Sequence, residues 1–189
     1  MKTVIHVWTH SLCNYTVTPL TARFGLGDLL RGAIGTLQYC EKRGYDCIID
    51  VSLHPLSQLL ETTPHQYSDL VYANRDKIMG IFTDRESFIE ETLKDNDSVL
   101  FFTNFGLDVY EKPLTQFVVN GIQNVLRFKP YFMDYVEKSI KKIPYPAFSI
   151  IHFRLGDSEL ILGESRESYS KYMRILIKNR QPKQILLSD

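Results

Sequence analysis

The residues from Val4 to Val51 constrain the fold most, because they predict a strand, a loop, a helix and a second strand in direct succession. Val4 to Trp8 and Cys47 to Val51 are short apolar runs. Between them, apolar residues at positions 29, 30, 33, 34 and 37 have helical spacing, and Gly44 is placed to end the helix. Units of this kind build parallel sheets with ligand sites at the carboxyl ends of the strands.

The rest of the chain predicts further elements of the first domain, then a linker and a second unit. The run from Ser98 to Thr103 predicts another strand, and helices are expected over about 113–126 and 130–142. The stretch KKIPYP interrupts this pattern with two prolines and predicts a linker. A strand at 147–153, a helix at about 168–179 and a strand at 184–187 follow. We therefore expect two α/β domains, residues 1–143 and 147–189.

The second domain is expected to be incomplete, because a doubly wound sheet normally continues through further strands and helices.

Composition excludes several classes of function. The chain has 22 Lys and Arg against 22 Asp and Glu, so no overall field attracts nucleic acid. No window reaches the ~18 apolar residues typical of a membrane span. Cys13, Cys40 and Cys47 lack the paired spacing of a zinc site or a redox motif, which favours free thiols. We expect a cytoplasmic globular protein without a nucleic-acid partner or a membrane span.

The peptide FSIIHFRLGD, from Phe148 to Asp157, is the strongest candidate for a site. Its mainly apolar start suits a buried parallel strand, and its polar groups begin where such a strand reaches its carboxyl end. Arg154 offers paired donors for phosphate oxygens, Gly156 lets backbone amides approach an anion, and Asp157 is placed to orient the Arg or bind a sugar hydroxyl. The alternative is a strand-end turn with a surface Arg–Asp pair.

The stretch FGLGDLLRG suggests a second site at the start of the first helix. Gly25 and Gly27 would present free amides and the positive helix end to an anion, and Arg31 would add charge one turn later. The third glycine of a dinucleotide fingerprint would fall at position 30, which is Leu30. A glycine-rich connection chosen for tight packing is the alternative. Asp28 suits either a helix cap or a working carboxylate.

Two other patterns carry no prediction of a site. Asp95-Asn96-Asp97 matches a metal-binding pattern, but it precedes a strand instead of following one, which favours a simple turn. The histidines lack metal-ligand spacing, and no Ser-His-Asp or Cys-His set is present. No metal site and no nucleophilic catalysis are expected.

Three peptides together resemble the fucosyltransferase superfamily: the Gly-Leu-Gly-Asp loop at 25–28, the His-x-Arg-x-Gly-Asp peptide at 152–157 and the Ser-Asp pair at 188–189. The superfamily includes bacterial α-1,2-fucosyltransferases, nodulation α-1,6-fucosyltransferases and protein O-fucosyltransferases. IHFRLGD is the most specific of the three peptides. The resemblance implies a GT-B fold of two Rossmann-like domains, of which this chain would lack part of the second.

The resemblance also implies residue roles in the second domain. Arg154 would bind the β-phosphate of GDP-fucose and stabilise the leaving diphosphate. His152, Gly156 and Asp157 would shape the donor pocket around it. Ser188 and Asp189 match the strand-end Ser-Asp pair that lines the nucleotide-sugar site.

In the first domain, the loop from Gly25 to Asp28 would face the cleft and contact donor and acceptor. Asp28 stands where several relatives have Asn, and an acid/base role is a hypothesis for it. The acceptor would be a glycan or another hydroxyl compound. The loops Pro55 to Arg75 and Phe105 to Lys112 are candidates for contacting it by position alone.

The implied reaction needs no metal and no cofactor beyond the GDP-sugar substrate. Negative charge grows on the leaving diphosphate, where a preorganised Arg and helix-end amides would stabilise it. A carboxylate on the acceptor side would assist attack with inversion at the sugar. Two alternatives remain open: a non-catalytic nucleotide- or glycan-binding relative, and an unrelated parallel α/β module.

Overall fold

The structure is a computed structural model and describes residues 1–9, 26–61, 67–81, 83–104, 113–145, 147, 149–153, 171, 174–175, 177–179 and 183–188. The side chains of 151–153 and 184–188 are not part of this description. The chain divides into two compact units, Met1–Met133 and Asp134–Asp189. This division falls inside a helix, α5 (Pro130–Lys141), whereas the sequence analysis placed the domain boundary after residue 143. The predicted boundary stays a prediction.

The first unit is built on a parallel sheet of four strands in the order β2-β1-β4-β3. The strands are β1 (Thr3–Val7), β2 (Asp46–Asp50), β3 (Met79–Gly80) and β4 (Ser98–Phe102). Thr3 lies opposite Asp46 on one side and Ser98 on the other, so the three long strands start and end together. The predicted parallel α/β architecture is confirmed for this unit, which is Rossmann-like.

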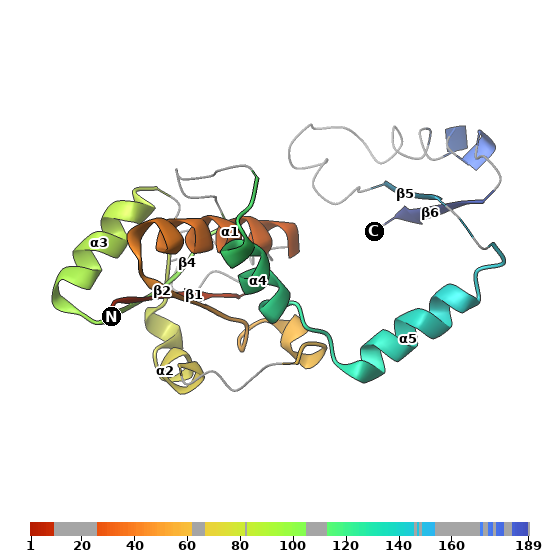
Figure 1. The fold of residues 1–189 in the computed structure, drawn as a ribbon. Coiled ribbons are helices and arrows are strands. Elements are labelled where there is room, and N and C mark those ends of the chain that lie inside the picture. Colours follow the sequence, from red (N-terminus) through yellow and green to blue (C-terminus); the bar gives the residue numbers. More distant parts are fainter. Residues whose placement is uncertain are drawn as a thin grey trace. The chain divides into compact units, whose positions relative to one another are not determined.

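Helices cover both faces of this sheet (Figure 1). Helix α1 (Leu26–Arg43) and α3 (Arg85–Asp95) lie on one face, and α2 (Ser68–Ala73) lies on the other. Alternate strand residues point to opposite faces. Val4, Val99 and Phe101 therefore pack with Tyr39 of α1 and Ile89 of α3 in one cluster. Their neighbours Ile5, Val7 and Phe102 belong to a second cluster that includes Val71 of α2.

Helix α1 matches its prediction closely, because its apolar positions recur at helical spacing and Gly44 ends it. Gly44 has φ +68°, the left-handed conformation that glycine adopts without strain. The helix begins at Leu26, three residues earlier than the apolar pattern indicated. Gly27, expected in the loop before the helix, therefore lies in its first turn.

A polar contact joins α1 to α3. The hydroxyls of Tyr39 and Tyr45 both donate to the Glu90 carboxylate, and Arg43 forms an ion pair with Glu90 at 3.3 Å. The hydrogen bond from Tyr39 is the main cause that lowers the pKa of Glu90. This contact helps hold α1 in position above the sheet.

Several short elements between β2 and β4 were not predicted from the sequence. The stretch from Pro55 to Arg75, expected as a loop, contains the 3-10 helix η1 (Pro55–Gln58) and helix α2, and η2 (Arg75–Lys77) follows. An isolated bridge between Leu60 and Phe128 ties this region to the segment after α4 (Gln116–Val125). Helix α4 packs against α1 (Figure 1).

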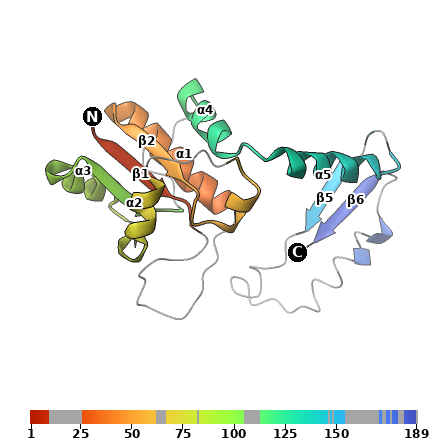
Figure 2. The same ribbon diagram turned by 90° about the horizontal axis from the view of Figure 1, so that it is seen from below.

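The second unit contains a parallel pair of strands, β5 (Ser149–Phe153) and β6 (Gln184–Ser188), seen side by side in Figure 2. Both strands were predicted, within two residues at each end. Their register places Phe153 opposite Ser188. The predicted helix at about 168–179 lies mostly outside the described residues. Within the described residues, no helix has the length and apolar character needed to cross a membrane.

Candidate functional site

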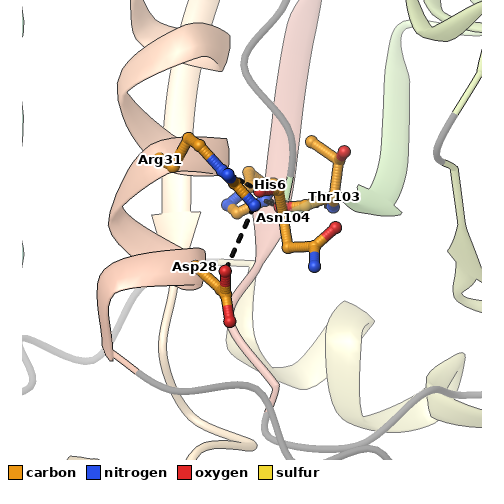
Figure 3. A network of polar contacts seen from close by, with 5 residues as sticks. All are labelled: His6, Asp28, Arg31, Thr103 and Asn104. Atoms are coloured by element: carbon orange, nitrogen blue, oxygen red, sulfur yellow. Dashed lines mark hydrogen bonds and ion pairs between the residues drawn. The ribbon is translucent and has the colours of Figure 1, made fainter. Parts of the chain in front are cut away.

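The candidate site lies where β1 and β4 end, beside the start of helix α1. Parallel strands bring their carboxyl ends to one edge of a sheet, which is the usual place for ligands in this class of fold. Five residues meet at this edge: His6 of β1, Asp28 and Arg31 of α1, and Thr103 and Asn104 after β4 (Figure 3).

Gly32 allows α1 to approach the end of β4 very closely. A Cβ atom added at Gly32 would lie 1.8 Å from the Thr103 carbonyl oxygen and 3.2 Å from His6 Nε2. Only hydrogen fits in this space. The third glycine of the dinucleotide fingerprint permits a close approach of the same kind. In this chain Gly32 does so, two residues after the position at which the fingerprint would place it.

His6 forms the floor of the candidate site. It is fully buried, and its Nε2 lies 2.9 Å from the carbonyl oxygen and 3.2 Å from the amide nitrogen of Thr103. Burial lowers the pKa of His6 to about 4, although the hydrogen bond with Thr103 opposes this shift. The imidazole is therefore neutral at pH 7. Its Nδ1 is buried and has no partner among the described residues.

Arg31 connects the helix start to the end of β4. Its Nε donates a hydrogen bond to the Asn104 carbonyl oxygen at 2.6 Å, and its Nη2 lies 3.2 Å from Asp28 Oδ1. Figure 3 shows Asp28 and Arg31 pointing toward each other from one face of α1. About half of the Arg31 side chain is exposed, so the pair is fixed in position and remains accessible to a ligand.

None of the described residues covers the start of the helix at Gly27. Gly27 is exposed, and a Cβ atom added there would meet nothing within 4 Å. The idea that Asp28 is the N-cap is wrong, because the helix begins at Leu26 and Asp28 lies inside the first turn. A carboxylate in this turn offsets part of the positive helix end. The surface therefore presents a carboxylate and a guanidinium together, which suits hydrogen bonding to hydroxyl groups better than binding a free anion.

The predicted residues of the second unit are only partly within the description. Arg154, Gly156, Asp157 and Asp189 lie outside the described residues, as does Gly25 of the first unit. His152 and Ser188 belong to the paired strands β5 and β6, near the end of each. The structure thus places the strand that contains His152 directly beside the strand that ends in Ser188.

The Asp-Asn-Asp stretch and the histidines were not expected to form a metal site. Asp95 ends α3 and Asp97 precedes β4, so the Asp-Asn-Asp stretch is the expected turn, at the amino end of the strand. Asp97 accepts a hydrogen bond from the backbone of Thr3 and forms an ion pair with Lys2 at 3.7 Å. Among the described residues, no group of His, Cys, Asp and Glu side chains is arranged to hold a metal ion.

His6 and Asn104 were not predicted as site residues. His6 stands in an apolar strand, where one polar residue in a period-2 pattern normally indicates the solvent face. Asn104 accepts a hydrogen bond from Arg31 through its backbone carbonyl oxygen. Every residue type has this group, so the sequence does not indicate the contact. One feature of the sequence could have indicated that His6 is buried. It lies two residues after Val4 and so on the same face of the strand, and the apolar Val4 indicates that this face is covered by other residues.

Comparison of the chain with models of protein families, with curated proteins and with solved structures gave no match to any of them.

Proposed function

We propose that the protein is a glycosyltransferase of the GT-B class that moves fucose from GDP-fucose to a hydroxyl of a glycan or another acceptor. The observation that carries the proposal is the accessible Asp28–Arg31 pair, held by Asn104 at the carboxyl edge of a Rossmann-like sheet. The resemblance of IHFRLGD to the donor-binding peptide of fucosyltransferases supports the same activity. The free thiols Cys40 and Cys47 are compatible with the proposed cytoplasmic location.

In this proposal the two units supply different groups. Arg154 binds the diphosphate of the donor and stabilises its growing negative charge. The donor pocket around it is formed by His152, Gly156, Asp157, Ser188 and Asp189. Asp28 accepts the proton of the attacking hydroxyl, and Arg31 holds the carboxylate in position. Gly27 is exposed and leaves the helix start accessible, and Gly25 is proposed to contact the donor beside it. No metal takes part, because the guanidinium supplies the positive charge at the leaving group.

Arg154→Ala is expected to weaken GDP binding about thirtyfold. A charge-assisted hydrogen bond to phosphate contributes about 2 kcal/mol, which corresponds to this factor. The measurement is calorimetric titration with GDP, and UDP serves as the test of nucleotide selectivity. Arg174→Ala removes the same charge from an exposed position of the same unit and is expected to leave the affinity unchanged. Equal affinities of the Arg154 variant and the wild type would disprove the donor-site assignment.

Asp28→Asn is expected to lower the rate of sugar transfer at least about a hundredfold while GDP affinity stays the same. Loss of a general base typically costs this much, and the amide keeps the shape of the side chain. The measurement is GDP release from GDP-fucose in the presence of acceptor glycans. Asp69→Asn, an exposed acidic residue in the first turn of α2, is the matched control. GDP binding without any transfer by the wild type would favour the non-catalytic alternative.

A further inference from the structure

A cavity of about 180 Å³ lies along the outer edge of β2, and none of the five residues of the candidate site lines it. Strand β2 forms one wall, helices α1 and α4 form another, and Glu61 and Ser68 complete the lining of a cavity that is partly open to solvent. All of these residues belong to the first unit.

The strand wall offers hydrogen-bond donors and acceptors in alternation. β2 is the last strand of its sheet, and the backbones of Asp46 and Asp50 form hydrogen bonds with Lys2 and Trp8, the residues that flank β1. Because the backbone groups of a parallel strand alternate in direction, the N–H and C=O groups of Cys47 and Ile49 point away from β1. Among the described strands, none pairs with this outer edge.

Asp50 provides a fixed carboxylate at the end of the same wall. It is 1% exposed, its Oδ1 accepts from the Ser52 amide at 2.9 Å, and its Oδ2 accepts from the Ser68 hydroxyl at 2.9 Å. Each carboxylate oxygen can accept a second hydrogen bond. The carboxylate is therefore preorganised in the wall of the cavity, where only a small part of it faces the space that a ligand would occupy.

The other walls limit the size and charge of an occupant. Gly121 of α4 lies so close to α1 that an added Cβ atom would be 2.7 Å from Leu37 Cδ2, which gives the cavity an apolar floor. Glu61 is paired with Arg127 at 3.8 Å, so its charge is partly balanced. The cavity resembles in size an engineered 150 Å³ cavity of another protein that holds one benzene ring.

We propose that this cavity binds one neutral, polyhydroxylated six-membered ring, a pyranose sugar or a cyclitol. Hydroxyl groups both donate and accept, so they can pair with the outward N–H and C=O groups of Cys47 and Ile49 and also with Asp50. The carbon face of the ring packs on Leu37. This inference does not depend on the proposed glycosyltransferase activity, because binding here needs no donor nucleotide.

Two other occupants fit less well. An organic ammonium ion would pair with Asp50 but has no acceptor for the outward N–H groups. An added β-strand along the five residues of β2 would need about 17 Å of open edge, because a strand rises about 3.4 Å per residue. The cavity is instead lined by side chains of α1 and α4 and by Glu61 and Ser68, as well as by β2, and its volume suits a single ring.

The test is a titration of the full, isotope-labelled chain, followed through the amide signals of Cys47 and Ile49. The probes are methyl α-D-glucopyranoside, methyl β-D-galactopyranoside and myo-inositol, with cyclohexylammonium chloride as the cationic comparison. A ligand of this size is expected to bind with a dissociation constant of about 1 mM. Asp50→Asn is expected to weaken binding about tenfold.

Because Asp50 also supports the local fold, a second pair of variants separates binding from stability. Asn124→Trp fills the mouth of the cavity from α4, whereas Gln123→Trp changes the next exposed residue, which does not line the cavity. Binding that is lost in the first variant and kept in the second supports the proposal. Binding of the methyl glycosides would identify the ligand as a pyranose sugar, and binding of myo-inositol would identify it as a cyclitol. Binding of the ammonium ion alone, no binding at about 100 mM, or equal binding by both variants would overturn it.

Discussion

Gly32→Ala is expected to destabilise the first unit by about 2 kcal/mol or more. The new methyl group would lie 1.8 Å from the Thr103 carbonyl oxygen and 2.8 Å from its carbonyl carbon, both of which are backbone atoms that cannot rotate away. Overpacking of this kind costs about 3 kcal/mol or more when the backbone has to move. The higher helix propensity of Ala returns about 1 kcal/mol of this loss.

Urea unfolding monitored through Trp8 measures this effect. Trp8 is the single tryptophan of the chain, it is buried, and its ring stacks on His54 at 4.9 Å, so its fluorescence reports on the first unit. Gly27→Ala is the matched control, because the same methyl group in the same helix meets no atom within 4 Å. That variant is expected to be as stable as the wild type or slightly more stable. Equal unfolding midpoints for the two variants would show that α1 does not approach Thr103 this closely.

The contrast between these two glycines shows how far the sequence determined the fold. Apolar periodicity was sufficient to predict β1, β2, β4, α1, α4 and α5, because each buries a continuous stripe or run. It did not distinguish the roles of Gly27 and Gly32. The partner of Gly32 is Thr103, 71 residues later in the chain, and a local pattern carries no information about such a contact.

The elements that the sequence analysis missed share a different cause. Helix α3 buries only Ile89 and Leu93, so its apolar stripe is too narrow to separate from a polar loop. Strand β3 has two residues, which is too short for any period to appear. These elements are stabilised by tertiary contacts with the sheet, and local propensity contributes little to them.

For the candidate site, the sequence indicated the start of the first helix as a place where polar groups gather, and Asp28 and Arg31 lie there. It could not indicate that Arg31 would be held by the backbone of Asn104, or that Asp28 would pair with Arg31 inside the first turn. Both contacts depend on the exact length of α1 and on its distance from β4. Gly32 fixes that distance, so packing and the geometry of the site have the same origin.

The first unit is expected to lose about 3 kcal/mol of stability between pH 7 and pH 4 through His6 alone. In the unfolded chain the imidazole takes up a proton near pH 6.5, whereas burial lowers its pKa in the folded state to about 4. Between these values the unfolded state binds more protons, so stability is complete above pH 6.5 and falls as the pH decreases toward 4. The difference of 6.5 − 4 = 2.5 pKa units corresponds to about 3 kcal/mol.

His6→Gln isolates this contribution, because glutamine can still form a hydrogen bond with the backbone of Thr103 and does not titrate. Both proteins are unfolded with urea at several pH values between 4 and 7.5, with Trp8 fluorescence as the signal. The stability difference between wild type and variant is expected to shrink or reverse as the pH falls, because only the wild type has the cost of keeping a buried histidine neutral. A difference that stays constant over this range would show that solvent reaches His6 in the folded protein. The close packing of α1 onto Thr103 at Gly32 would then be in doubt as well, since that packing is what covers the imidazole.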